Sequence, residues 1–275
     1  MYLAFAGKGS SGKSTIAAML IPWLCQTRPD ARVLVVDADP HQSLCGLLQC
    51  TPPTTLGGLR SQYERTLLTG RDAMLRPDET RVAFAERALG TQALYRTPHF
   101  DLLAIGQWEL PGSQCTPNRV LGMALASLAG AYDYVIVDHE AGIEHIGRFT
   151  ELPIDRLILV ATPDALSLDV AGRVLQYAAQ VNRTIHAAGV VLNRVEEDDE
   201  GNVQVAGTLD HLALRGAPVL GQLPESRGLR RCSRSGVGPQ GLDSTDPWQE
   251  AVLSILPVVL DDVSAEAGLK AADVV

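Results

Sequence analysis

A glycine-rich loop near the amino terminus constrains the fold of this chain more than any other feature. Residues 7–15 read GKGSSGKST and match the pattern G-x-x-x-x-G-K-[ST], with the apolar run Tyr2–Ala6 before them and the apolar run Ile16–Leu24 after them. A strand, a glycine-rich loop and a helix in this order form a cradle in which backbone N–H groups and the helix dipole face a phosphate. A simple glycine and serine turn is the alternative, but the spacing and both flanks favour the phosphate-binding loop.

Each position of this pattern has an expected role. Lys13 is expected to bridge the β- and γ-phosphates of a nucleotide, and the hydroxyl group of Ser14 is expected to bind Mg²⁺. Backbone N–H groups supply the other phosphate contacts. The residues predicted to bind nucleotide phosphate are Gly7, Lys8, Gly9, Ser10, Ser11, Gly12, Lys13, Ser14 and Thr15.

A second lysine, Lys8, lies in the same loop, and an ordinary phosphate-binding loop does not require it. It is either a solvated surface charge or a second phosphate contact. The loop resembles the K-G-G-x-G-K-[ST] loop of the deviant-Walker-A ATPases (SIMIBI class, MinD/ParA type), with Ser10 where that family usually has its second glycine. The resemblance implies that Lys8 reaches a nucleotide phosphate, often across a dimer interface. The residues that carry it are Lys8, Gly9, Gly12, Lys13 and Ser14.

Two aspartates follow the next apolar run. Arg32–Val36 leads into the sequence D-A-D-P, which contains Asp37 and Asp39. Such a pair often caps a helix or a turn, but in open parallel sheets the carboxyl ends of strands face the ligand. The family resemblance implies that Asp39 positions the attacking water and that Asp37 lies on the Mg²⁺ side. Positioning and charge neutralisation are most of what an NTPase requires from protein groups.

A third apolar run, Tyr132–Val137, ends in Asp138. Downstream of a phosphate-binding loop this looks like a Walker B site, in which Asp138 holds Mg²⁺ and Gly142 responds to the γ-phosphate. His139 and His145, with glutamates beside them, present a metal-binding alternative. Their spacing is not H-E-x-x-H, so hydrogen-bonding residues of the switch are the preferred interpretation.

Two segments carry a more specific resemblance than the loop does. Residues 140–145 read EAGIEH, and residues 112–118 read GSQCTPN. They resemble the segments E-A-G-x-E-H and G-C-x-C-P-x-N of one subgroup, the CooC-like ATPases, with Ser113 in place of the first cysteine. These are accessory proteins in the maturation of the carbon monoxide dehydrogenase nickel site. The resemblance implies that Cys115 binds Ni²⁺ or Zn²⁺ at a dimer interface. Taken alone, Cys115 is a small apolar loop residue, since these metals require several ligands.

The ends of two later strands are expected to surround the base. Ala187–Leu192 leads into Asn193 and Arg194, and the resemblance implies that this asparagine recognises the adenine edge; a turn cap is the alternative. Pro218–Leu223 leads into Pro224, where relatives close a loop over the base. We therefore include Asn193, Arg194 and Pro224 in the predicted nucleotide site.

The overall charge limits the partners. The chain has 23 Lys and Arg against 32 Asp and Glu, a net charge of −9, which argues against broad attraction to nucleic acid or to an anionic membrane. A local cluster of arginines could meet nucleotide phosphate, an acidic protein face or nucleic acid, or remain solvated. Its members are Arg227, Arg230, Arg231 and Arg234.

Cysteine usage and hydropathy indicate a cytoplasmic protein. The five cysteines, at positions 25, 45, 50, 115 and 232, are an odd number without C-x-x-C spacing, which is typical of reduced thiols. The first expected strand leaves no room for a signal peptide, and no apolar run reaches the length of a membrane span.

The alternation of apolar runs with helical patterns predicts an α/β fold, a doubly wound and mostly parallel sheet with helices on both faces, as in P-loop NTPases. We expect one domain over residues 1–275, with a variable helical excursion at 50–98 and an acidic tail at 258–275. Helices are expected within the excursion at Leu56–Leu68 and Asp72–Leu89. Helices elsewhere are expected at Ser14–Gln26, Arg119–Leu128, Leu166–Val181 and Pro247–Leu256, and two further strands at Phe100–Ile105 and Arg156–Ala161.

The sequence thus predicts a Mg²⁺-dependent ATPase that acts as a nucleotide-switched homodimer. By resemblance, its expected role is that of an accessory ATPase in the maturation of a metalloenzyme client. The alternative is a ParA/MinD-like positioning protein that acts on DNA or on a protein partner. A small-molecule kinase is a third candidate, because the phosphate-binding loop does not choose between water and a substrate hydroxyl.

Overall fold

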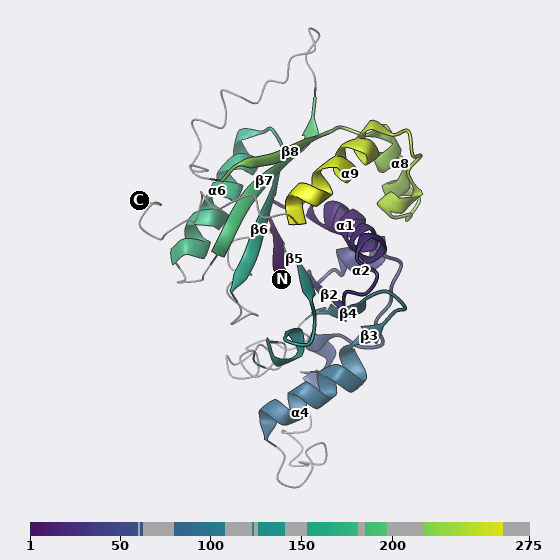
Figure 1. Cartoon of the computed structure of the whole chain (residues 1–275), viewed down its shortest axis with the longest axis vertical. Helices are drawn as coiled ribbons and strands as arrows, with labels where there is room; N and C mark the ends of the chain where they lie inside the picture. The colour runs from purple at the N-terminus through teal and green to yellow at the C-terminus, as the bar shows by residue number, and fades with distance from the viewer. Residues whose placement is uncertain are drawn as a thin grey trace.

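One eight-stranded sheet organises the computed structural model (Figure 1). The strand order is β3-β4-β2-β5-β1-β6-β7-β8, and every neighbouring pair is parallel except β3 with β4. The strands are β1 (Tyr2–Ala6), β2 (Val33–Ala38), β3 (Tyr95–Arg96), β4 (Asp101–Ala104), β5 (Tyr134–His139), β6 (Ile154–Ala161), β7 (Ile185–Val195) and β8 (Val219–Pro224). The structure describes residues 1–59, 61–62, 80–107, 123, 126–140, 153–180, 185–196 and 217–260.

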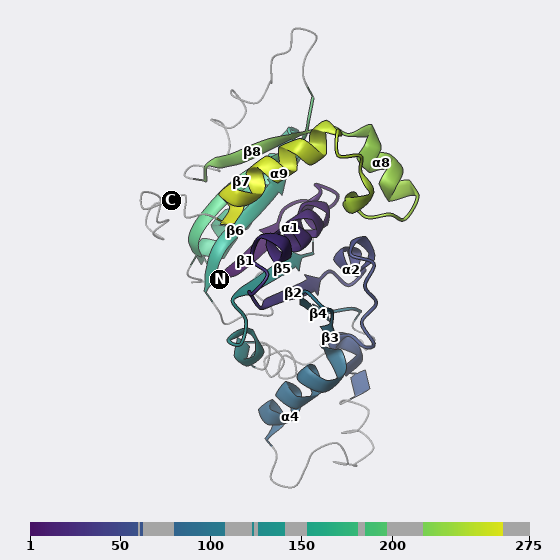
Figure 2. The ribbon, with the colours of Figure 1, turned by 45° about the vertical axis from the view of Figure 1, so that its right-hand side comes forward.

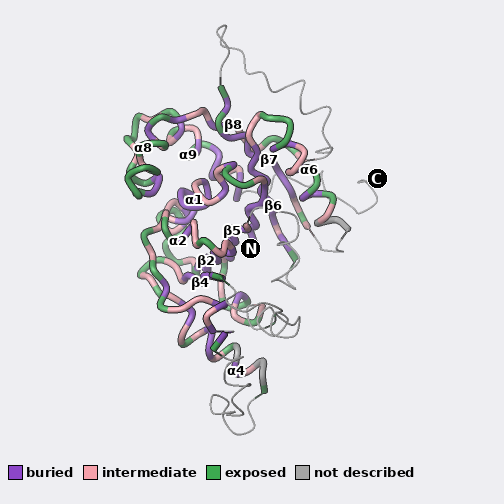
Figure 3. Tube along the Cα trace, turned by 180° about the vertical axis from the view of Figure 1, so that it is seen from behind, coloured by how far each residue is buried: buried purple, intermediate pink, exposed green. Residues whose placement is uncertain are grey.

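The central strands are apolar on both sides. In β1, Ala4 packs into the core on one face of the sheet, and Leu3 and Phe5 pack into the core on the other face. A strand that is covered on both faces has no polar side, which is why the run Tyr2–Ala6 does not alternate. Figure 3 shows the strands of the sheet as a largely buried centre.

Helices cover both faces of the sheet, as the sequence predicted (Figure 1), and Figure 2 shows α1 and α9 over one of these faces. Helices α1, α2 and α9 contribute to one core, and helices α4 and α6 contribute to the other. No helix in the described part of the chain has both the length and the hydrophobicity needed to cross a membrane. The helices are α1 (Lys13–Thr27), α2 (Ser43–Leu47), α4 (Arg81–Ala88), α6 (Ala165–Gln180), α8 (Arg227–Arg234) and α9 (Pro247–Leu260), with short π and 3₁₀ turns at Leu89–Ala93 and Pro239–Gly241.

The strand order brings the phosphate-binding loop and two acidic strand ends together. Strand β5 lies between β1 and β2, so the chain after β1 must cross over β5 to reach β2. In open α/β sheets a ligand crevice forms at such a switch point, beyond the carboxyl ends of the strands. Here the loop after β1 and the ends of β2 and β5 meet at that edge.

Several elements differ from the prediction. The excursion at 50–98 is not only helical, because it ends in β3, which pairs antiparallel with β4. Helices α2 and α8 were not predicted, since one has five residues and the other shows no apolar period. Helix α9 continues past the expected end at Leu256 to Leu260, so residues 258–260 of the expected tail are helical. Helix α4, at Arg81–Ala88, lies within the helix expected at Asp72–Leu89, whereas residues 63–79 of the excursion lie outside the described residues.

Candidate functional site

The phosphate-binding loop has a backbone shape that requires glycine at two positions. Gly7 and Gly12 have φ values of 140° and 104°, and Ser10 has a φ of 64°. A Cβ atom on Gly7 would lie 2.2 Å from the carbonyl oxygen of Val160 in β6. A Cβ atom on Gly12 would lie 2.2 Å from the side-chain nitrogen of Asn193. The loop is therefore pressed against β6 and β7, and only glycine fits at these two contacts.

Lys13 is held inside this loop. Its ammonium group donates hydrogen bonds to the carbonyl oxygens of Gly7, at 3.3 Å, and of Lys8, at 3.1 Å. Only 6% of the residue is exposed, and this burial lowers the pKa of Lys13, while the nearby carboxylates of Asp138 and Asp39 oppose the shift. The loop thus holds a cation beside the cavity before any phosphate binds.

Two buried aspartates lie side by side on neighbouring strands. Asp37 of β2 is paired in register with Asp138 of β5, and neither is exposed. Asp37 accepts hydrogen bonds from the backbone N–H groups of Asp39, at 3.1 Å, and Cys45, at 2.8 Å. Asp37 therefore anchors the start of α2, and burial raises its pKa.

Asp138 differs from its neighbour. Neither of its carboxylate oxygens has a hydrogen-bond partner of good geometry among the described residues. Burial raises the pKa of Asp138 to about 7, although the hydroxyl of Ser14 lies near enough to lower it. A buried carboxylate costs free energy unless a partner satisfies it. The carboxylate of Asp138 and the hydroxyl group of Ser14 lie close together. Mg²⁺ prefers oxygen ligands of this kind.

Asp39 and Glu140 are the acidic residues that line the nucleotide cavity among the described residues, and Asp39 is the one held by hydrogen bonds from the turn after β2. Its two carboxylate oxygens accept hydrogen bonds from the backbone N–H of His41, at 2.9 Å, and from the hydroxyl of Ser43, at 2.6 Å. These contacts fix the orientation of the carboxylate within the turn that starts α2. His41 and Ser43 were not among the predicted site residues, although an aspartate followed by a serine just before a helix is typical of turns and helix caps.

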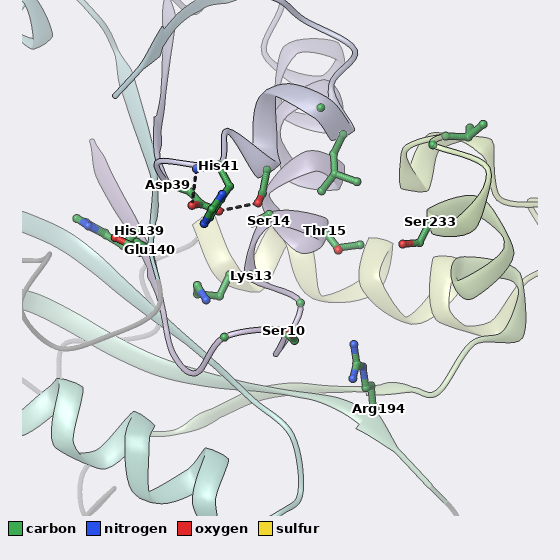
Figure 4. Close-up of a pocket in the computed structure, with 17 residues that line it drawn as sticks. Ser10, Lys13, Ser14, Thr15, Asp39, His41, His139, Glu140, Arg194 and Ser233 are labelled. Carbon is green, nitrogen blue, oxygen red and sulfur yellow. Dashed lines mark hydrogen bonds between the residues drawn. The ribbon is translucent and has the colours of Figure 1, made fainter. Parts of the chain in front are cut away.

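Lys13, Ser14 and Asp39, with His41 and Ser43, are among the residues that line a cavity of about 660 Å³. Lys13, Ser14 and Asp39 lie toward one end of it, and Arg194 and Ser233 lie toward the other (Figure 4). A cavity of this size holds a ligand as large as a nucleotide. One end offers the ammonium group of Lys13 and the oxygens of Ser14 and Asp39, and the other end reaches α8 through Ser233.

The structure gives Asn193 a role that the sequence did not show. Its amide nitrogen donates to the carbonyl oxygen of Ser11 in the loop, at 2.8 Å, and its amide oxygen accepts from the indole N–H of Trp248 in α9, at 3.0 Å. Asn193 is 2% exposed and Trp248 is 1% exposed. The amide therefore connects the phosphate-binding loop to α9. Its predicted contact with adenine stays a prediction.

Comparison with known proteins identifies the family. A family model described as the CobQ/CobB/MinD/ParA nucleotide binding domain matches residues 2–239. This chain belongs to that family. It is a MinD/ParA-type P-loop ATPase domain that binds ATP, in agreement with the predicted recognition and fold.

Individual relatives agree with this assignment. An uncharacterized ATP-binding protein of Methanocaldococcus jannaschii is 29% identical over 242 residues, which cover 86% of this chain and 89% of the relative. The carbon monoxide dehydrogenase accessory protein CooC of Rhodospirillum rubrum is 31% identical over 224 residues, which cover 72% and 81%. The septum site-determining protein MinD of Pyrococcus horikoshii, solved with Mg-ADP, has a TM-score of 0.63 at 21% identity and covers 98% of both chains.

The second lysine of the phosphate-binding loop is paired with a residue outside the loop. Lys8 forms an ion pair of 3.6 Å with Asp164, which precedes α6. Both side chains are well exposed, at 37% and 52%, so the pair contributes little to stability. Lys8 is therefore free to exchange this partner for another anion at small cost. Its predicted contact with phosphate stays a prediction.

The remaining predicted site residues of the domain have different outcomes. Arg194 lines the cavity and forms an ion pair of 3.8 Å with Glu225. Pro224 ends β8 but is not among the residues that line the cavity. Gly142 and Cys115 lie outside the described residues. Within the part of the chain that the structure describes, no group of three or more His, Cys, Asp or Glu side chains is arranged to hold a metal ion.

Proposed function

We propose that this ATPase domain hydrolyses ATP and uses the nucleotide as a switch. The observation that supports this most directly is the meeting of a cation and two acidic groups at one edge of the sheet. Lys13 follows the loop after β1 and Asp39 follows β2, and both line the cavity. Asp138, the penultimate residue of β5, is buried behind them. In this proposal the loop N–H groups and Lys13 bind the phosphates, and Lys8 adds a second cation.

The metal part of the proposal rests on the buried carboxylate of Asp138. Ser14 and Asp138 would hold Mg²⁺, which neutralises phosphate charge when it is bound. The fit is good because Asp138 has two unsatisfied oxygens, whereas both oxygens of Asp37 already bind backbone N–H groups. We therefore assign Asp37 a supporting role beside the Mg²⁺ site, in which it positions α2 and the adjacent turn without binding the metal itself.

Asp39 is assigned to the attacking water. Its carboxylate is held by His41 and Ser43, so it presents a fixed acceptor at the cavity wall. A carboxylate held in this way orients a water molecule for attack without having to reorganise. The carboxylate and the ammonium of Lys13 interact electrostatically across the cavity.

Lys13→Ala and Asp39→Ala test this assignment by separate effects. We expect Lys13→Ala to abolish both tight ATP binding and phosphate release, because the buried cation is lost. We expect Asp39→Ala to bind ATP about as well as the native protein but to release phosphate at least 100-fold more slowly. Phosphate release is measured without an added acceptor, and Asp30→Ala, at an exposed site outside the cavity, is the matched control.

Two results would contradict the assignment. Unchanged turnover of Asp39→Ala would remove the water-positioning role from Asp39. ADP formation that appears only after a hydroxyl acceptor is added, with the phosphoryl group found on the acceptor and not as free phosphate, would favour the small-molecule kinase instead.

For the output of the switch we propose an accessory role in metalloenzyme maturation. The support is the 31% identity to CooC and the segments that resemble the CooC-like ATPases. The ParA/MinD-like positioning role is the second candidate, and the structural similarity to MinD favours it. Salt-sensitive DNA binding that appears only with ATP would contradict the maturation role and support the positioning role.

A further inference from the structure

Helix α8 carries a row of arginines on one side. The four arginines are spaced at i, i+3, i+4 and i+7, which places them within an arc of about 100° and along about 10 Å of the helix. All four are exposed, and Figure 3 shows α8 as one of the exposed parts of the molecule. We call this surface the arginine face: Arg227, Arg230, Arg231 and Arg234.

The opposite side of α8 is fixed to the body of the domain. Ser226 caps the helix by accepting a hydrogen bond from the N–H of Leu229, at 2.9 Å, and it donates to Asp246, at 2.8 Å. A Cβ atom on Gly228 would lie 2.4 Å from the Asp246 carboxylate, so the helix is seated closely there. Leu229 packs against the core that contains α9. The arginine face is therefore held in one orientation and does not need to be ordered on binding.

Most of the arginine face has no acidic partner. Arg230 forms an ion pair of 3.1 Å with Glu225. Arg227, Arg231 and Arg234 form no ion pair with any other residue that the structure describes. A concentrated row of cations is unusual on a chain whose net charge is −9, and mutual repulsion within the row opposes its formation. A bound anion would remove that repulsion.

The arginine face adjoins the nucleotide cavity. Ser233 belongs to α8 and lines the cavity. Glu225 also pairs with Arg194, which lines the cavity, so one carboxylate joins Arg230 to the cavity wall. A partner that takes up the guanidinium of Arg230 would alter this chain of charges. A ligand bound to the arginine face would therefore change the ion pairs beside the nucleotide cavity, and so could change nucleotide affinity.

We propose that the arginine face docks an acidic segment of a protein partner, with carboxylates spaced to match two turns of a helix. A planar guanidinium binds a carboxylate through two parallel hydrogen bonds, which arginine provides and lysine does not. Nucleic acid fits less well, because the sequence pI is about 5.1 and the cationic row is short. Proteins that bind duplex DNA usually present a larger basic surface and a basic pI. The proposal does not depend on ATP hydrolysis.

The test uses a synthetic helical peptide of about 16 residues with glutamates at i, i+3, i+4 and i+7. Its dissociation constant is measured with the full chain, without nucleotide, at low and moderate salt. A peptide with glutamine at the same positions and a duplex DNA are the comparison ligands. The protein variant is Arg227→Glu with Arg231→Glu. The control variant is Arg28→Glu with Arg96→Glu, because these arginines are also exposed and lie outside α8.

We expect the glutamate peptide to bind the native chain, with a dissociation constant that rises at least tenfold in the α8 variant and less than threefold in the control variant. The glutamine peptide should bind at least tenfold more weakly. Both variants change only exposed residues, so their melting temperatures should match that of the native chain. The proposal is overturned if the glutamate peptide does not bind, if both variants weaken it equally, or if the DNA binds more tightly and loses its affinity in the α8 variant.

Discussion

At the scale of residues, two neighbouring carboxylates of the site differ in the hydrogen bonds that they accept, and this difference indicates different roles. Asp37 and Asp138 are paired across β2 and β5 and are equally buried, yet only Asp37 has N–H donors. The sequence predicted that both aspartates lie beside Mg²⁺. The structure supports a division in which Asp37 supports α2 and Asp138 is left to bind a cation. No pattern in the sequence shows this difference, because the donors come from the turn after β2.

The unsatisfied carboxylate of Asp138 should make stability depend on pH. In the unfolded chain Asp138 is ionised above about pH 4, whereas in the folded protein its pKa is about 7. The folded protein therefore binds more protons than the unfolded chain between these values, and stability falls as pH rises through this window. Without divalent cations, we expect the melting temperature to drop by several degrees from about pH 5 to about pH 8.

Asp138→Asn provides the comparison for this prediction. The amide does not ionise, so the decline in melting temperature should become clearly smaller, and the part that remains is assigned to Asp37, whose pKa is also raised. Added Mg²⁺ should raise the melting temperature of the native protein at about pH 8 more than that of the variant. An identical decline in both proteins would show that Asp138 is not the titrating group.

At the scale of elements, one amide joins three parts of the fold. Asn193 of β7 binds the phosphate-binding loop on one side and Trp248 of α9 on the other. Helix α9 also packs against β8, and α8 is attached to the start of α9 through Ser226 and Asp246. A change in the loop can therefore reach α8 through buried contacts.

Trp248→Phe tests this connection. Phenylalanine keeps a buried aromatic ring but removes the indole N–H, so the amide oxygen of Asn193 loses its donor at a cost of about 1–3 kcal/mol. We expect a lower melting temperature together with ADP binding that is weakened about threefold or more, measured by calorimetry. Trp23→Phe is the control, since Trp23 lies in α1 and its side chain forms no hydrogen bond with the loop in the part of the chain that the structure describes. A lower melting temperature with unchanged ADP affinity would mean that Trp248 has only a packing role.

Helix α8 illustrates what the sequence shows about an element and what it hides. The spacing of the four arginines is visible in the sequence, but the side of the helix that faces the domain contains Gly228, Leu229 and Cys232. One leucine gives no apolar period, so the pattern did not predict a helix. The close approach of Gly228 to Asp246 seats the helix there, and that contact joins segments that are distant in the sequence.

At the scale of the whole molecule, the predicted homodimer depends on Lys8. In a single chain Lys8 pairs with Asp164 on the surface, and exchange of this weak pair for a phosphate on a second copy would cost little. ATP would then favour the closed dimer, because it binds that state more tightly than the open one.

This gives a prediction about mass in solution. With ATP, Asp39→Ala should have twice the mass of the monomer, whereas with ADP or no nucleotide it should be a monomer. Lys8→Ala added to Asp39→Ala should remain a monomer with ATP. Light scattering after size exclusion gives the masses, and nickel and zinc are determined on the same samples. A monomer in all states would contradict the switch, and metal content unaffected by Cys115→Ala would contradict the predicted metal site.

The sequence by itself determined the phosphate-binding loop, the order of the central parallel strands, and the strand ends near which Asp37, Asp39 and Asp138 lie. These features depend on neighbouring residues, so spacing and apolar runs are enough to predict them. Tertiary structure alone decided that Asp138 stays unsatisfied and that Asn193 holds the loop. Asn193 is 182 residues from Ser11 and 55 residues from Trp248. Contacts over such separations form only when the sheet places the strands side by side, and no local pattern encodes them.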